Sequence, residues 1–237
     1  AYRTDGVYQN DNEVPFCYIN GRKRPLGVGS LFYRAGDRII LDYDGNGRIG
    51  TSLPLEEDRV YCGSPLPIAQ GGIVSTLNWK GFDLNLLFNY VIGRHILNAG
   101  KGASLGTYMS AFEKELTKPV FADLSKVSFW QKPGDRADYP ANRLEDGLMN
   151  FSTYLSSNIE KVSYLKLKTL TLGYTLPVKW KEKLGFGARI FISAENLFTI
   201  TNYSGPDPES VDIITGVDNL TNYPLATRVT FGLTLKL

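Results

Sequence analysis

The chain has 237 residues, of which 43% are hydrophobic, and its 26 Lys+Arg against 24 Asp+Glu give a formal net charge of +2. Because no long block of one sign is present, we expect neither a nucleic-acid partner nor a polybasic membrane anchor. No apolar stretch approaches the roughly 18 residues that a transmembrane helix needs. The 14 Tyr, 12 Phe and 24 Gly favour strands and turns, so the composition favours an all-β fold.

The N-terminal residues have neither the basic region nor the apolar core of a secretory signal. We therefore expect either a cytoplasmic protein or a chain that begins within a longer one. The two cysteines, Cys17 and Cys62, lack the spacing of a metal site. They either form a disulfide in an oxidising compartment or stay as two unpaired thiols.

Residues 42–49 match the first half of a calcium-binding loop, in which oxygen ligands stand at the first, third and fifth positions and Gly at the sixth. The twelfth position holds Leu53 instead of Glu, so Glu56, Glu57 or Asp58 would have to complete the site. The alternative is a turn whose side chains cap their own backbone. The predicted Ca²⁺ site consists of Asp42, Asp44, Asn46, Arg48 and Asp58.

Residues 73–92 predict a β-hairpin. Apolar and polar side chains alternate in residues 73–79 and 82–92, and Lys80-Gly81 makes the tight turn between them. One face of the second strand carries Asp83, Asn85 and Asn89. Its opposite face is apolar and consists of Phe82, Leu84, Leu86, Phe88, Tyr90 and Ile92.

A long loop, rich in Gly, Pro, Asn and Asp, is predicted at about residues 93–158. Four of its aromatic residues offer large contact surfaces on which sugar rings or peptide side chains could stack. Packing within the loops, or against a partner, is the alternative. The four are Tyr108, Phe129, Trp130 and Tyr139, of which we predict Tyr108, Trp130 and Tyr139 as substrate-binding residues.

The sequence gives no support for catalysis. The lone His95 stands at the start of the loop, without the spacing of a Ser-His-Asp or Cys-His arrangement. Nothing in the sequence places the neighbouring carboxylates of residues 56–58, or the pair Glu113 and Glu115, about a substrate. We therefore predict that the protein is not an enzyme and has no catalytic residue.

Two more strands are predicted over residues 159–176 and 188–200, joined by the short link 177–187. The apolar positions of the first of these strands change parity near Lys168. A bulge, or a strand end that projects beyond a membrane, would explain the change.

A second long loop is predicted at about residues 202–226, followed by the clearest strand of the chain, residues 228–237. Small or polar residues, including Thr230 and Lys236, form one face of this strand. The apolar face consists of Val229, Phe231, Leu233, Leu235 and Leu237.

The predicted strands, of which all but residues 73–79 have ten residues or more, suit the tilted crossing of an antiparallel transmembrane β-barrel. Short connections on one side and long loops on the other fit the same fold. Aromatic residues near the short connections fit a membrane-interface girdle. They are Trp79, Phe82, Tyr174 and Trp180. Because the smallest barrels have about eight strands, five strands cannot close one, and we expect further strands from outside this chain.

Several segments, taken in order along nearly the whole chain, resemble the C-terminal part of the SusC/RagA family of TonB-dependent outer-membrane transporters of Bacteroidetes. The segments are Tyr2–Asn10, Gly36–Gly47, Gly63–Pro67 with Gly71-Gly72, Lys80–Leu84, Tyr164–Pro177, Ala194–Glu209, Tyr223-Pro224 and the terminal strand. One departure is Leu237, where such strands often end in Phe.

The resemblance implies that residues 1–237 form the C-terminal wall and the extracellular loops of a barrel of about 22 strands. The plug domain, the TonB-contacting segment and the N-terminal extension are expected outside these residues. The implied function is active import of oligosaccharides or peptides across the bacterial outer membrane. The implied partners are a SusD-like surface lipoprotein, the TonB complex, the remainder of the barrel and outer-membrane lipid.

Two other functions fit parts of the sequence. A secreted or surface glycan-binding β-sandwich would use the same alternation to face a core instead of lipid. A calcium-stabilised surface adhesin would depend on the Asp42 loop alone.

Overall fold

The computed structural model describes residues 1–50, 58–101, 128–141, 143 and 149–236. The chain forms two compact units. None of the helices in the described ranges is long and apolar enough to cross a membrane. The first unit comprises Ala1–Gly63, Leu97–Glu160 and Val217–Leu220, and the second comprises Ser64–Ile96, Lys161–Gly216 and Thr221–Leu237.

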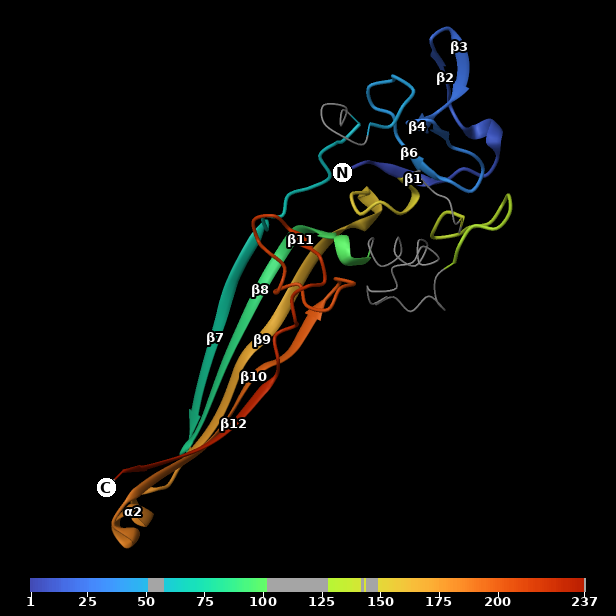
Figure 1. Cartoon of the computed structure of the whole chain (residues 1–237). Helices are drawn as coiled ribbons and strands as arrows, with labels where there is room; N and C mark the ends of the chain where they lie inside the picture. The colour runs from blue at the N-terminus through green and yellow to red at the C-terminus, as the bar shows by residue number, and fades with distance from the viewer. Residues whose placement is uncertain (51–57, 102–127, 142, 144–148, 237) are drawn as a thin grey trace. The chain divides into compact units, whose positions relative to one another are not determined.

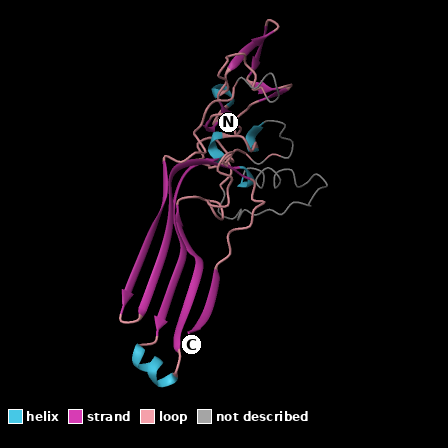
Figure 2. Cartoon of the chain, turned by 90° about the vertical axis from the view of Figure 1, so that its left-hand side faces the viewer, coloured by secondary structure: helices cyan, strands magenta, loops and turns pink. Residues whose placement is uncertain are grey.

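The five long strands of the described residues form one sheet, most of which belongs to the second unit. The strands lie side by side in chain order, and the short β11, Val217–Asp218, runs parallel to the end of β8 (Figures 1 and 2). This sheet confirms the predicted all-β class. The long strands are β7 (Ala69–Trp79), β8 (Phe82–Asn98), β9 (Ile159–Thr175), β10 (Gly187–Thr201) and β12 (Arg228–Lys236).

The strand register places the predicted apolar positions on one face of the sheet. Ile192 of β10 lies opposite Leu172 of β9 on one side and Phe231 of β12 on the other. Residues directly opposite in an antiparallel pair share a face. The rings of Phe82 and Tyr174, with centroids 4.5 Å apart, extend this face across β8 and β9. The alternation in each strand therefore describes a single apolar face.

The two short connections lie at the same end of the sheet. The Lys80-Gly81 turn has positive φ at both residues, as the tight hairpin requires. The second connection contains a short helix, α2 (Val178–Leu184), where only a link was predicted. The Thr175 amide, at the end of β9, donates a 2.8 Å hydrogen bond to the Gly81 carbonyl and joins the two connections.

Two boundaries differ from the prediction. β8 continues to Asn98, so the loop predicted from residue 93 begins later. Beyond Gly93 the buried Arg94 and Ile96 have the same parity as the exposed Ile92, so the alternation changes phase at the glycine. The irregularity expected near Lys168 lies instead on β10, where the register shifts between Glu195 and Phe198. Three steps along β10 match two along β9, so β10 holds the extra residue of a β-bulge.

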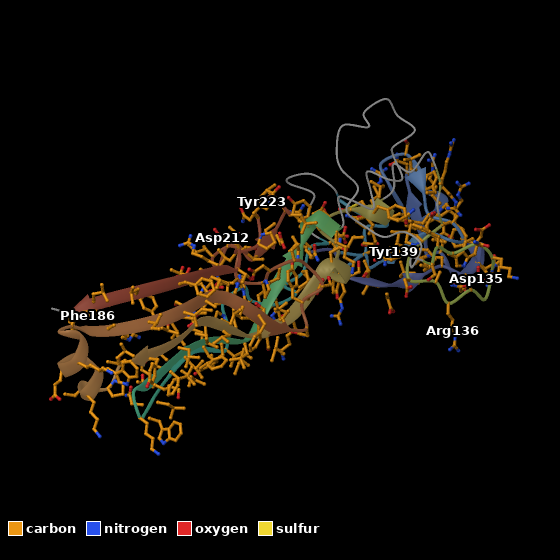
Figure 3. The ribbon with its side chains drawn as sticks, turned by 90° about the horizontal axis from the view of Figure 1, so that it is seen from below. Asp135, Arg136, Tyr139, Phe186, Asp212 and Tyr223 are labelled. Carbon is orange, nitrogen blue, oxygen red and sulfur yellow. The ribbon has the colours of Figure 1, made fainter. Side chains whose placement is uncertain are left out.

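The loop predicted at residues 202–226 packs against β8 and β9, near the end of the sheet that lies away from the short connections. Its Tyr203 and Val211 form a buried cluster with Ile96 of β8 and Val162 of β9. Figure 3 shows Asp212 and Tyr223 of this loop far along the sheet from Phe186, which lies beside α2. The loop end and the short-connection end of the sheet are therefore opposite ends.

The first unit contains short elements that the sequence did not predict. The strand pairs are β1 (Thr4–Val7) with β6 (Arg38–Ile40), β2 (Phe16–Ile19) with β3 (Arg22–Pro25), and β4 (Gly27–Val28) with β5 (Leu31–Phe32). The 3₁₀ turns are η1 (Asp11–Glu13), η3 (Met149–Phe151) and η4 (Ser156–Asn158). The core of the unit consists of Tyr2, Tyr8, Val14, Leu26, Tyr33, Ile40, Ile49 and Leu155.

Candidate functional site

The apolar face of the sheet is exposed within the second unit. Phe231 is 78% exposed and Trp79 is 67% exposed, although both are large apolar side chains. Soluble proteins rarely expose a contiguous apolar surface of this extent, so the face fits contact with lipid acyl chains. Its exposed members include Ile73, Leu77, Trp79, Phe82, Ile92, Leu172, Ile190, Val229, Phe231, Leu233 and Leu235.

The opposite, polar face carries a ladder of side-chain contacts across the strands. Arg189 of β10 donates two hydrogen bonds to the Asp83 carboxylate of β8, at 3.1 and 2.5 Å. The pair crosses β9 above Gly173, where an added Cβ would lie 2.5 Å from both Asp83 Oδ1 and Arg189 Nη2. A glycine on the middle strand therefore leaves the space that the ion pair occupies.

Further contacts on the polar face link neighbouring strands. The Thr171 and Ser193 hydroxyls lie 2.8 Å apart, and the Thr76 hydroxyl donates a 2.9 Å hydrogen bond to Asn85. Asn85 and Asp83 were predicted to share the face opposite the apolar side chains, and the register confirms this. The sheet thus has one apolar face and one polar face.

A buried cluster of charges attaches the loop of residues 202–226 to β9. Lys166, with a side chain only 2% exposed, contacts Asp207 at 2.8 Å and Glu209 at 2.9 Å. Lys168 contacts Glu209 at 2.9 Å. Burial alone would raise the pKa of Asp207, but the hydrogen bond from Lys166 and backbone amides hold it below its usual value. The pKa of Glu209 is lowered in the same way, by both lysines.

Arg94 of β8 attaches the same loop at a second point. Its Nη2 donates a 2.8 Å hydrogen bond to the Asp212 carbonyl, and the side chain is buried. The sequence prediction missed this attachment because Arg94, Lys166 and Asp207 belong to segments far apart in the chain, and their only local signal is a charge in an alternating strand or a polar loop.

The structure brings together three carboxylates of the predicted Ca²⁺ site. Asp42, Asp44 and Asp58 each offer an oxygen, and these oxygens lie within 4.8 Å of one another. Asp58, one of the three acids proposed from the sequence to complete the site, is buried and supplies the third carboxylate of this group. Its carboxylate accepts hydrogen bonds from the amides of Tyr43 and Gly50. Glu56 and Glu57 lie outside the described residues.

The same carboxylates also cap the backbone of their own turn. Asp42 accepts hydrogen bonds from the amides of Gly45 and Gly47, at 2.8 and 2.9 Å, and Asn46 accepts one from the Arg48 amide. Burial raises the pKa of Asp42, and the neighbouring acids Asp44 and Asp58 raise it further. The loop therefore shows both the capped turn and the gathered oxygens that the sequence left as alternatives.

The predicted aromatic contacts have partners within the first unit. Trp130 Nε1 donates a 3.1 Å hydrogen bond to Gln9 Oε1, and the Arg38 guanidinium lies 5.9 Å from the centroid of the Tyr139 ring. The ring of Phe129 packs beside that of Tyr139 at 6.0 Å. Trp130 and Tyr139 are thus half-buried in loop packing, and Tyr108 lies outside the described residues.

The disulfide considered for Cys17 and Cys62 does not form in the structure, in which both residues are free. Cys17 Sγ lies 3.3 Å from the Gly47 carbonyl, whereas Cys62 Sγ lies 3.5 Å from the Val60 carbonyl. Each thiol packs against its own stretch of backbone. Of the two alternatives, the structure therefore has two unpaired thiols.

The sequence is similar to those of TonB-dependent receptors. It is 31% identical to TonB-dependent receptor P3 of Formosa agariphila over 89% of this chain and 18% of that protein. It is 28% identical to receptor P39 of the same organism, over 100% of this chain and 23% of the relative. Its identity to TonB-dependent receptor SusC of Bacteroides thetaiotaomicron is 26%, over 84% of this chain and 18% of SusC.

The fold is similar to that of a solved transporter. The chain aligns with the RagAB peptide importer in its closed-closed state with a TM-score of 0.58 and 24% identity, over 99% of this chain and 22% of that one. No protein-family model matches the chain. The chain spans about a fifth of the length of these relatives. Its sequence and its partial barrel identify the chain as part of a SusC/RagA-like TonB-dependent receptor.

Proposed function

We propose that this chain forms wall and extracellular loops of an outer-membrane receptor that actively imports large solutes, and that it is not an enzyme. The observation that carries the proposal is the register. It gathers exposed apolar side chains on one face of five long strands, and polar contacts such as Asp83 with Arg189 on the other. A barrel wall between lipid and a polar lumen requires this division.

The proposed partners follow those of the family. They are a SusD-like lipoprotein at the cell surface, the TonB complex, which would contact a part of the receptor outside this chain, and the strands that complete the barrel. The proposed substrates are oligosaccharides or peptides. The RagAB structures are of a peptide importer, whereas the sequence relatives are named only as receptors.

The location can be tested with the full-length protein. We expect it to fractionate with the outer membrane and to migrate faster on a gel before boiling than after. Such a heat shift is what a closed barrel gives, since every strand edge in it is paired. A soluble protein that needs no detergent would contradict the proposal.

Import can be tested by deleting the gene and supplying oligosaccharides or oligopeptides as the sole source of carbon or nitrogen. Loss of growth on one class would assign the substrate. Unchanged growth and uptake on both classes would contradict import.

The β-sandwich alternative receives no support from the described residues. Among those of the second unit there is no second sheet, and Phe231 and Leu233 of the apolar face are exposed. A sandwich should fold in buffer when this chain is expressed alone, whereas a piece of barrel wall should aggregate.

A further inference from the structure

The short-connection end of the sheet carries a group of exposed cations, which we call the basic rim. Lys80 lies in the β7–β8 turn, Lys179 and Lys183 lie on α2, and Lys236 ends β12, opposite Gly187. All four side chains are exposed. These elements meet at one end of the sheet (Figures 1 and 2). The only described acid on α2 is Glu182, so the rim has an excess of positive charge.

The rim cations differ from Lys166 and Lys168 of β9. Lys166 and Lys168 both form ion pairs, with Asp207 and Glu209. Within the part of the chain that the structure describes, no carboxylate lies at ion-pair distance from the four rim lysines. The positive charge of the rim is therefore available to a ligand from outside the unit.

Exposed tryptophans lie among the rim cations. The Lys80 ammonium lies 5.1 Å from the centroid of the Trp79 ring, and Trp180 on α2 is 54% exposed. Trp side chains favour the level of lipid headgroups, because the ring is apolar and its N–H is polar. Lysine stems can lie along apolar surface while the ammonium reaches the headgroups.

The rim is also continuous with the apolar face. Trp79 pairs with Phe82, and the ring of Phe82 packs on that of Tyr174 just before α2. A membrane that covers the apolar face must therefore place its headgroups beside the rim. A soluble acidic protein would match the lysines but would leave the exposed Trp79, Trp180 and Val178 without an apolar partner.

We propose that the basic rim binds the phosphates of anionic phospholipids in the membrane leaflet on the short-connection side. Lys80, Lys179 and Lys183 supply the charge, and Trp79 and Trp180 hold the rim at headgroup depth. The proposal rests on the proposed function, because it requires the sheet to be embedded in the outer membrane.

The test uses the full-length receptor, purified in mild detergent, with phosphatidylglycerol or phosphatidylethanolamine added and bound lipids counted by native mass spectrometry. We expect the wild type to retain phosphatidylglycerol in preference to phosphatidylethanolamine. The triple variant K80Q/K179Q/K183Q should weaken the binding of phosphatidylglycerol at least about fivefold, because the loss of a single surface lysine already weakens the attraction to an anionic lipid by about that factor. The variant K80R/K179R/K183R should keep it.

A matched control removes the same number of charges elsewhere. Lys23, Lys132 and Lys161 are exposed; the first two belong to the first unit, and Lys161 lies at the start of β9, at the other end of that strand from α2. The variant K23Q/K132Q/K161Q should therefore bind phosphatidylglycerol as the wild type does. Equal retention of the two lipids by the wild type would overturn the proposal, as would unchanged binding by the rim variant. An acidic protein that copurifies with the wild type and is lost from the rim variant, with lipid binding unchanged, would assign the rim to that protein and also overturn the proposal.

The heat shift separates the two proposals. A wild type that neither fractionates with the outer membrane nor shifts on a gel would contradict the proposed function. A receptor that does both, but whose rim variant keeps its lipids, would contradict the lipid proposal alone.

Discussion

Asp83 and Arg189 form a two-point ion pair that bridges three strands by passing over Gly173. The partners lie on β8 and β10, and the glycine lies on β9 between them. The contact therefore depends on a residue that takes no part in it.

We predict that Gly173→Ala destabilises the barrel. Its Cβ would lie 2.5 Å from both partners, so the ion pair must move or break. The measurement is the temperature at which the full-length receptor loses its heat shift, which should fall. The control is Gly72→Ala on the same polar face, where the nearest atoms lie at an ordinary 3.5 Å. An equal effect of the two variants would show that Gly173 has no special role.

Lys166→Met should release the loop of residues 202–226. The substitution keeps the length of the side chain but leaves Asp207 and Glu209 without their buried partner. Breaking a buried ion pair in this way lowers the stability by about 3 kcal/mol. Limited proteolysis should then cut this loop faster. Lys161→Met, at an exposed position of the same strand, is the control. Loop cleavage at the wild-type rate in the Lys166 variant would contradict the anchoring role.

The loop should also detach in acid. The pKa values of Asp207 and Glu209 are lowered in the folded protein, so the stability they contribute is complete above their unfolded values of about 4 and is lost as the pH falls through the folded values. A fluorophore on a cysteine introduced at the exposed Ile214 should gain mobility below about pH 4. Lys166→Met should already be mobile at neutral pH. A wild-type loop that stays rigid through this range would exclude the mechanism.

Calcium should stabilise the first unit through the Asp42 loop. At a concentration about a hundredfold above the dissociation constant, Ca²⁺ should add about 2.7 kcal/mol to the free energy of unfolding. Asp44→Ala should lose this shift, whereas Asp5→Ala, at an exposed acid outside the cluster, should keep it. Thermal unfolding with and without Ca²⁺ makes the measurement. Equal shifts in the wild type and in Asp44→Ala would exclude a metal at this loop.

The long strands could be predicted because alternation over about ten residues is a strong signal. The signal was sufficient to place Phe82 and Phe231 on the apolar faces of their own strands before the register was known. It failed for the first unit, whose strands have two to four residues, too few for a period to show. α2 was missed for the same reason, since its seven residues complete only two turns.

The candidate sites could be predicted only where their residues lie close together in the sequence. The Asp42 loop could be predicted because its oxygens are spaced along one short segment, and even Asp58 lies nearby in sequence. The attachment of Asp207 to Lys166 joins residues 41 positions apart, and no spacing rule connects them. The hydrogen bond from Trp130 to Gln9 was missed for the same reason, because the partner of a loop aromatic can lie far away in the chain.

The bulge on β10 changes what the polar face offers along its length. Between the bulge and the short-connection end, this face carries Thr171 and Ser193. Between the bulge and the loop end, Phe198 lies opposite Leu167, and Ile200 opposite Leu165. The inserted residue reverses the alternation of β10, so that every side chain after the bulge lies on the face opposite to the one its position would otherwise give. If the alternation continued unbroken from Ile190, Phe198 would lie on the apolar face; the observed pairing with Leu167 places it on the polar face instead. In the proposed receptor, a solute that enters from the loop end would therefore contact the apolar side chains of Phe198 and Ile200 before the hydroxyl groups of Thr171 and Ser193.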